Sequence, residues 1–300
     1  MRAATVDRHG GPEVLRVVEL DRPRASSGQV LVRVRASGVQ PFDTYARQGR
    51  DGFRFALPHQ LGNEFAGVVE GVGEAVEDVA AGDEVLGWAA MASQADYVVT
   101  DREAIVAKPA DLPWDEAGAI SASGQTALTA LAALHVGPDD TLLVHGAAGG
   151  AGSAIVQLAR RRGAAVIGTA SEANHAYLRE LGAIPVGYGP GTVERVRAAA
   201  PDGVTVALDV VGGQALRDAL ALVPDRGRIG TLVEHSAADG LGVLGIRAQR
   251  SGTRLRELVA AYRAGALRVT IRSSHPLEKI ADAHRDVESG HGRGKVVITL

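Results

Sequence analysis

A glycine-rich turn between an apolar run and a helix is the part of this sequence best suited to chemistry. Residues 142–144 are apolar and lead into Gly146-Ala147-Ala148-Gly149-Gly150-Ala151-Gly152. Glycines let the backbone turn tightly and let a phosphate approach its N–H groups. A helix that opens near Ser153 would point the positive end of its dipole at that phosphate. The pattern therefore predicts a dinucleotide site, and the residues expected to contact it are Gly149, Gly150, Ala151 and Gly152.

The glycine spacing by itself also fits an ordinary loop. Ala147 stands where the usual G-x-G-x-x-G pattern has its first glycine, and the chain holds 38 glycines. The residues that follow favour the nucleotide site. Residues 160–163 end the helix with three arginines and a glycine, as helix ends prefer. Residues 165–169 then form a second apolar run, which completes a βαβ unit of about 30 residues.

Strands and helices alternate along the chain from residue 119 to residue 249. After the second strand we expect helices at 173–181, 192–200 and 214–222, and strands at 184–188, 204–209, 227–233 and 241–246. This alternation predicts an α/β protein with a doubly wound parallel sheet. Ligands bind such a sheet at the carboxyl ends of its strands, where the glycine turn lies.

The sequence on both sides of this region favours a β-rich fold. Residues 30–36 alternate apolar and charged side chains, as a half-buried strand does, and no strong helical period precedes Trp114. The last residues, 295–300, are too apolar for a free tail and are expected to rejoin the N-terminal part as a strand. The nucleotide-binding region would then be an insertion. The predicted division is 1–118, 119–249 and 250–300.

Composition narrows the classes of partner. The net charge of −3 gives no reason to expect nucleic acid or an acidic membrane surface as a partner. The chain has no cysteine, which excludes disulfides and thiolate metal sites. No apolar leader opens the sequence, and the uncharged stretch 117–136 is too polar for a bilayer, so a buried helix is expected there. We therefore expect a cytoplasmic protein.

Five stretches spread over nearly the whole chain carry a more specific signal: 10–15, 36–44, 62–69, 145–152 and 294–297. Together they resemble the medium-chain dehydrogenase/reductases, in particular the zinc-free, zeta-crystallin-like quinone oxidoreductase branch. The resemblance implies a Rossmann sheet inserted into a GroES-like β-barrel domain, with the active site between them. It also implies a homodimer, in which an exposed edge strand at 241–246 would pair with its twin.

The positions of the zinc ligands argue against a metal. Zinc-dependent members of this superfamily place a cysteine in the segment matching 38–43, a histidine in that matching 62–64, and often a cysteine near residue 122. Here these places are taken by Gln40, Asn63 and Ala122. Amide and methyl groups are poor zinc ligands beside thiolate and imidazole. Zinc-alkoxide oxidation is therefore not expected, whereas a conjugated acceptor spreads the incoming charge without a metal.

The end of the second predicted strand favours NADPH over NADH. NAD sites carry an acidic residue there for the ribose 2′-OH, and Ala170 stands at that place. Ser171 would donate to a 2′-phosphate, and it is equally suited to be a helix N-cap. The resemblance implies that Tyr188 helps to bind this phosphate. It also implies a lysine, whose place is taken by Asn174 or His175, which weakens the expected selectivity.

Near the nicotinamide, the resemblance points to Gln40, Asp43, Tyr45, Asn63 and Thr126. Gln40, Tyr45 and Asn63 are expected to line the substrate pocket, with no firm acid or base among them. Tyr45 would donate a proton or only form a wall, and we favour the wall because the proton can come from solvent. The Thr126 hydroxyl would form a hydrogen bond with the nicotinamide amide or ribose, or else with a backbone carbonyl of its own helix. Asp43 fits a structural turn as well as a catalytic role, and Glu64 is expected to order its loop.

These expectations converge on an NADPH-dependent quinone oxidoreductase that transfers hydride to a quinone or related conjugated carbonyl, mainly by proximity. An enoyl or enone reductase is the alternative within the same family. An alternative of another class is an NADPH-binding sensor with little turnover. The expected partner is a small molecule, with no nucleic acid and no membrane.

Overall fold

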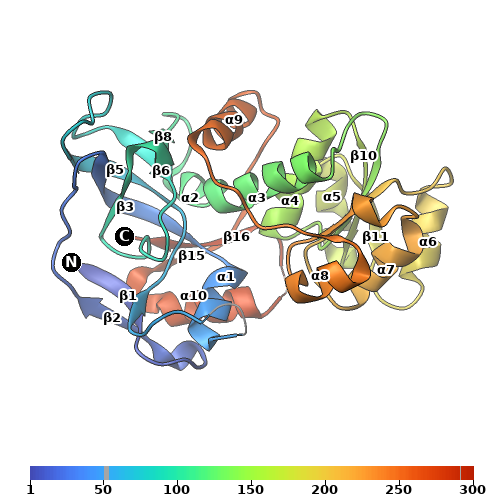
Figure 1. Cartoon of the computed structure of the whole chain (residues 1–300), viewed down its shortest axis with the longest axis horizontal. Helices are drawn as coiled ribbons and strands as arrows, with labels where there is room; N and C mark the ends of the chain where they lie inside the picture. Colours follow the sequence, from blue (N-terminus) through green and yellow to red (C-terminus); the bar gives the residue numbers. More distant parts are fainter. Residues whose placement is uncertain (51–53, 291) are drawn as a thin grey trace.

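A mixed seven-stranded sheet forms the first of two lobes in the computed structural model, which describes residues 1–50, 54–290 and 292–300 (Figure 1). Its strands, in order, are β15 (Ile271–Pro276), β16 (Lys295–Thr299), β3 (Gln29–Val39), β5 (Phe65–Val72), β6 (Glu84–Gly87) and β8 (Ile105–Ala107), with β7 (Tyr97–Asp101) also paired to β3. A smaller antiparallel sheet joins β2 (Leu15–Glu19), β1 (Arg2–Val6) and β4 (His59–Gln60). These two sheets make up the β-rich lobe.

The C-terminal strand belongs to this β-rich lobe, as the sequence predicted. β16 lies antiparallel to β3, with Val297 opposite Gly38. Val296, Val297 and Ile298 are buried there. The chain therefore leaves the β-rich lobe, builds the second lobe and returns. The division at 118/119 and 249/250 stays a prediction.

The second lobe, here the parallel-sheet lobe, is a six-stranded parallel sheet. Its strand order is β11 (Ile184–Gly187), β10 (Ala165–Ala170), β9 (Thr141–His145), β12 (Val206–Asp209), β13 (Ile229–Thr231) and β14 (Leu244–Gly245). The helices are α3 (Ile120–Ala133), α4 (Gly150–Arg161), α5 (His175–Glu180), α6 (Thr192–Ala199), α7 (Gln214–Leu222) and α8 (His235–Leu241). Leu142 and Val144 pack with residues of α3 and α4, whereas Leu143 packs with residues of α6 and α7. Helices therefore cover both faces of the parallel sheet, which explains why residues 142–144 are all apolar. The doubly wound Rossmann prediction is confirmed.

Two expectations about secondary structure need correction. The edge strand expected near 241–246 is present but short: α8 runs to Leu241, Gly242 ends it in the left-handed region at φ 70°, and β14 covers only Leu244–Gly245 at the edge of the sheet. A helix also occurs before Trp114, namely α1 (Pro41–Gln48). The buried residues of α1 include Asp43 and Arg47, so its sequence lacks the regular spacing of apolar residues by which a helix is recognised. Pro41 starts it and Gly49, in the left-handed region, ends it.

Smaller differences lie at element ends. α4 begins at Gly150 rather than near Ser153, and α5 begins at His175 after a 3-10 turn, Glu172–Asn174. The remaining helices are α2 (Trp114–Ala117), α9 (Gly252–Arg263) and α10 (Ile280–Glu288).

Helix α1 is held in place by α10 through a buried arginine. The Arg47 guanidinium is fully buried and pairs with Glu288 of α10. Its Nη1 lies 3.4 Å from Nδ1 of His284, whose side chain is also buried. Its Nε donates to the carbonyl oxygen of Gly10 at 3.1 Å. This contact fixes the helix that carries Asp43 and Tyr45.

The buried histidine predicts a loss of stability in acid. Burial, with a further contribution from Arg47, lowers the pKa of His284 to about 3, from an ordinary value of 6.5. Below pH 6.5 the unfolded chain binds a proton here that the folded protein does not. The free energy of unfolding should therefore fall between about pH 6.5 and pH 3, by up to about 1.4 kcal/mol per pH unit. Urea unfolding of wild type and His284→Asn at several pH values measures this slope.

The substitution His284→Asn keeps an acceptor near Arg47 and removes the titrating ring, so its slope should be flatter than that of the wild type. His135→Asn, at an exposed histidine, is the matched control and should leave the slope unchanged. Equal slopes for wild type and His284→Asn would contradict the role of this histidine.

Candidate functional site

The glycine turn joins the end of β9 to the start of α4. Gly149 has ordinary extended backbone, and a Cβ added there would meet only the carbonyl oxygen of Gly146, at 3.5 Å. A Cβ at Gly152 would instead overlap that same oxygen, so this glycine lets the helix pack against the turn. A turn that admits a Cβ at Gly149, at the positive end of a twelve-residue helix, is compatible with a pyrophosphate. The dinucleotide site at this turn stays a prediction.

Ser171 and Tyr188 follow neighbouring strands at the same edge of the parallel sheet. Ala170 of β10 lies opposite Gly187 of β11. Ser171 and Tyr188 each come directly after one of these paired residues. The Ser171 hydroxyl accepts a hydrogen bond from Nδ2 of Asn174 at 3.1 Å and caps no backbone N–H. Tyr188 is 63% exposed. Both side chains are thus available at the carboxyl ends of their strands.

Asp43 is a buried carboxylate that holds two backbone segments and one pocket residue. Its Oδ2 accepts from the Gln40 backbone N–H at 2.9 Å, and its Oδ1 accepts from the Gly62 N–H at 3.2 Å. The same Oδ1 accepts from Nδ2 of Asn63 at 3.1 Å. Burial raises the pKa of the Asp43 carboxyl to about 6. Asp43 therefore positions Asn63 and the start of α1.

Glu64 is a second buried carboxylate, and it joins four parts of the chain. Its Oε1 accepts from Nζ of Lys295 at 2.7 Å and from Nε2 of Gln40 at 3.1 Å. Its Oε2 accepts from the backbone N–H of Ala122, in the first turn of α3, at 2.7 Å. The Glu64 side chain is 0% exposed and that of Lys295 is 6% exposed. The pair links the β-rich lobe to the helix that carries Thr126.

Lys295 was missed by the sequence analysis. It lies at the start of the apolar strand β16, and a lysine there needs a counter-charge, which was the available signal. Its side chain also passes Gly150: a Cβ on that glycine would come within 2.5 Å of Cδ of Lys295. The lysine therefore touches the glycine turn and the buried Glu64 together.

The structure also gives contacts for the other two pocket candidates. The Thr126 hydroxyl donates to the carbonyl oxygen of Ala122 at 2.7 Å, so here it bonds back to its own helix. Tyr45 lies on α1, and the Arg50 guanidinium stacks over its ring at 4.3 Å. Gln40, Asn63 and Thr126 are brought together around Glu64 and its neighbours. The roles assigned to these residues stay predictions.

Arg250, which the sequence analysis did not single out, reaches this group from the other lobe. It lies on the segment between β14 and α9. Its Nη1 donates to the carbonyl oxygen of Asn63 at 3.3 Å, across 187 positions of sequence. Only the folded chain reveals this contact.

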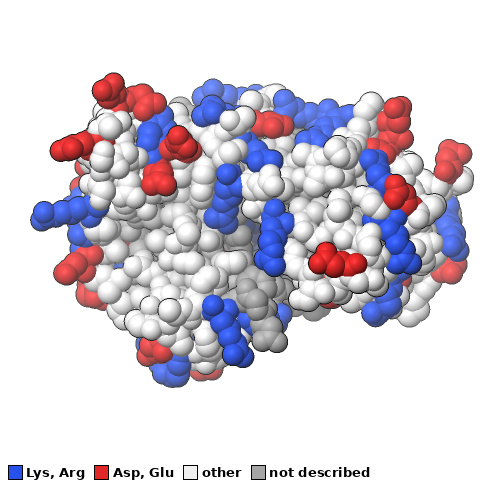
Figure 2. Space-filling view, in the orientation of Figure 1, with Lys and Arg blue, Asp and Glu red and all other residues white. Residues whose placement is uncertain are grey.

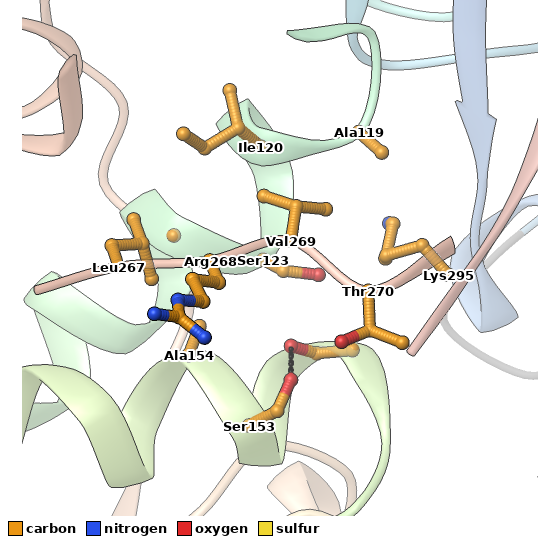
Figure 3. A pocket seen from close by; sticks show the side chains of 12 residues that line it. Ala119, Ile120, Ser123, Ser153, Ala154, Leu267, Arg268, Val269, Thr270 and Lys295 are labelled. Carbon is orange, nitrogen blue, oxygen red and sulfur yellow. Dashed lines mark hydrogen bonds between the residues drawn. The ribbon is translucent and has the colours of Figure 1, made fainter. Parts of the chain in front are cut away.

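A small cavity lies between α3 and the start of α4 (Figure 3). Ser123, Ser153, Thr270 and Lys295 line it, and Oγ of Ser153 donates to the Gly150 carbonyl oxygen at 3.1 Å. Its volume of about 10 Å³ has room for one water molecule. It is therefore too small for a nicotinamide or a quinone.

In the part of the chain that the structure describes, no three His, Asp or Glu side chains form a group that could hold a metal ion. Within the same residues, no helix combines the length and the apolar character needed to cross a bilayer.

The chain is similar to known proteins over its whole length. Residues 26–124 match the alcohol dehydrogenase GroES-like domain, and residues 181–298 match the zinc-binding dehydrogenase family. The chain is 30% identical to the quinone oxidoreductase of Mus musculus, with 100% of this chain and 98% of the mouse protein covered. For that of Lama guanicoe the identity is 31%, with the same coverage.

Solved structures agree with these sequence matches. The quinone oxidoreductase from Coxiella burnetii superposes with a TM-score of 0.91 at 30% identity, covering 100% of this chain and 99% of that chain. The Escherichia coli quinone oxidoreductase complexed with NADPH gives a TM-score of 0.89 at 25% identity, with both chains fully covered.

Proposed function

We propose that this chain, which belongs to the quinone oxidoreductase family, reduces a quinone or a related conjugated carbonyl with NADPH and without zinc. One observation carries the zinc-free part of the proposal. The amide nitrogens of Gln40 and Asn63, at the places of two zinc ligands, donate to the buried carboxylates of Glu64 and Asp43. Amides committed in this way are poor ligands for a metal ion. Reduction of a conjugated acceptor requires no such ion.

Three observations support NADPH as the coenzyme. At the start of α4, a Cβ added to Gly149 would meet only the Gly146 carbonyl oxygen, at 3.5 Å. Ala170 brings no carboxylate to repel a 2′-phosphate, and Ser171 and Tyr188 follow paired strand positions beside it. The related Escherichia coli enzyme was solved with NADPH. When bound, the reduced nicotinamide supplies the hydride.

The residues of this chain would act mainly by positioning. Gly149, Gly150, Ala151 and Gly152 would hold the pyrophosphate, and Thr126 would face the nicotinamide. Gln40, Tyr45 and Asn63 would line the acceptor site. Because Gln40 and Asn63 are oriented by buried carboxylates, they are fixed before the acceptor arrives, which favours catalysis by proximity. We also propose a homodimer that pairs the short edge strand β14, whose Leu244 is exposed.

Oxidation of NADPH and of NADH after dialysis against a chelator tests the proposal. We expect turnover that resists the chelator, prefers NADPH, and is faster with benzoquinone than with a simple enone. Turnover of the enone alone would indicate an enoyl or enone reductase instead. Tight NADPH binding without oxidation by either acceptor would indicate a sensor. Loss of activity on chelation, with recovery on adding zinc, would overturn the zinc-free proposal.

A further inference from the structure

Arg250 lies on a segment that crosses from one lobe to the other. The chain between α8 and α9 passes in front of the junction between the lobes (Figure 1). On this face, basic side chains lie along the junction (Figure 2). Arginine is charged at any pH at which the protein is folded, so this residue brings a permanent positive charge to the junction.

Both neighbours of Arg250 are anchored to α3. The backbone N–H of Gln249 donates to Oγ1 of Thr129 at 3.1 Å, and that of Ser251 donates to Oε1 of Gln125 at 2.8 Å. Thr126, the candidate for the nicotinamide, lies on the same helix between these two anchors. The backbone of Arg250 is thus fixed by the element that would face the coenzyme.

The side chain of Arg250 reaches Asn63, one of the residues proposed to line the acceptor site. Nη1 donates to the carbonyl oxygen of Asn63 at 3.3 Å. Burial lowers the pKa of the guanidinium, and the negative charges of Glu64 and Asp43 act in the opposite direction. Among the described residues, no carboxylate lies within ion-pair distance of this guanidinium: Glu64 pairs with Lys295, and Asp43 accepts from Gln40, Gly62 and Asn63. The other N–H groups of Arg250 therefore keep their capacity for an anion.

The pocket amides and Lys295 are less suited to this role. One N–H of each amide donates to a buried carboxylate, Glu64 for Gln40 and Asp43 for Asn63, so the remaining N–H is a neutral donor beside a negative charge. The charge of Lys295 is balanced by Glu64, with which it forms an ion pair. A negatively charged oxygen in this site is therefore better stabilised by Arg250, which has no carboxylate partner among the described residues.

We propose that Arg250 is a catalytic residue that binds the carbonyl oxygen of the acceptor, and that it selects acceptors which become oxyanions on reduction. This inference rests on the proposed function. When NADPH is bound, a C–H bond of its nicotinamide would break and the hydride would bond to the far end of the conjugated acceptor, away from the carbonyl carbon. The electron pair of the C=O π bond then moves on to the carbonyl oxygen, giving an enolate or the phenolate-type anion of a hydroquinone. The guanidinium pairs with that oxygen, and a proton from solvent then completes the reduction.

Binding of 4-nitrophenol tests the proposal without turnover. Its phenolate absorbs at a longer wavelength than its neutral form, so the spectrum reports which form is bound. In the presence of NADP⁺, the wild-type protein should bind the phenolate preferentially and lower the apparent pKa of the bound phenol. Arg250→Met should abolish that preference, and Arg250→Lys should keep part of it, because lysine retains the charge but not the planar fork.

Turnover gives the second measurement. Arg250→Met should lower kcat for benzoquinone by about 100-fold or more, the loss seen when one oxyanion donor is removed. NADPH affinity should stay within about twofold. Arg256→Met is the matched control nearby on α9, since Arg256 is exposed and its Nη2 donates to a side-chain oxygen, Oγ1 of Thr253, at 3.2 Å. It should behave as wild type in both measurements.

The outcomes separate this inference from the proposed function. If Arg250→Met keeps the phenolate preference while wild type reduces quinone, the inference is overturned and the function stands. If Tyr45→Phe removes the preference and Arg250→Met does not, the donor is Tyr45. If wild type reduces no acceptor yet binds phenolate through Arg250, the proposed function fails and the anion site stands. If the thermal midpoint shows that Arg250→Met does not fold, Arg250→Lys replaces it in both measurements.

Discussion

Replacing Lys295 with methionine is expected to lower the free energy of unfolding by about 3–5 kcal/mol, the usual cost of leaving one partner of a buried ion pair alone. The Glu64 side chain is 0% exposed, and its Oε1 would lose the charged partner that now lies 2.7 Å away. Gln40 and the Ala122 N–H would remain as neutral donors. They cannot compensate for a charge that water does not reach.

Urea unfolding and the thermal midpoint measure this loss. Lys108→Met is the matched control, because Lys108 is equally buried but its partner, Glu84, is 48% exposed. Water can solvate Glu84 after the substitution, so that pair should cost about 1 kcal/mol or less. The double variant Lys295→Met with Glu64→Gln removes both charges and should recover most of the loss. A Lys295→Met protein as stable as the Lys108→Met protein would contradict the role of the buried pair.

Replacing Gly149 with valine is expected to reduce NADPH affinity at least 100-fold, or by about 2.8 kcal/mol in binding free energy. The Gly149 backbone is extended, and a Cβ there meets only the Gly146 carbonyl oxygen at 3.5 Å, so the folded protein accommodates the side chain. The branched side chain would then occupy the space through which the phosphate approaches the start of α4. Titration of NADPH fluorescence measures the affinity.

The control for this prediction is Gly137→Val, since a Cβ at Gly137 meets nothing within 4 Å and its backbone is also ordinary. Gly137 lies after α3, outside the glycine turn, so its variant should bind NADPH as the wild type does. Both variants should melt within a few degrees of the wild type. A Gly149→Val protein that binds NADPH normally would place the coenzyme elsewhere.

The glycine turn and the parallel sheet could be predicted because their signals are local. A strand, a turn and a helix that follow one another within about 30 residues leave periodic apolar positions and glycines in the sequence. The same reasoning failed for α1, because its buried positions include Asp43 and Arg47 instead of apolar residues. It also overestimated the strand near 241–246, because Gly242 ends helix α8 and only Leu244–Gly245 form the strand.

The pocket residues were predicted from the resemblance, but their orientation was not. The resemblance placed Gln40, Asn63 and Thr126 near one another. It did not determine which amide atom of Gln40 or Asn63 faces a ligand. That depends on Glu64 and Asp43, which accept hydrogen bonds from the NH₂ groups and so set how each amide is turned.

The α/β class, the glycine turn and the return of the last strand could be predicted from the residues alone, because each follows from the sterics and apolar period of consecutive residues. Which charges meet depends on the packing of distant segments. Lys295 and Glu64 lie 231 positions apart, and Arg250 and Asn63 lie 187 apart. Their pairing depends on how β16 and the segment before α9 pack against the β-rich lobe. A buried charge finds its partner through the path of the whole chain, and no local pattern encodes that path.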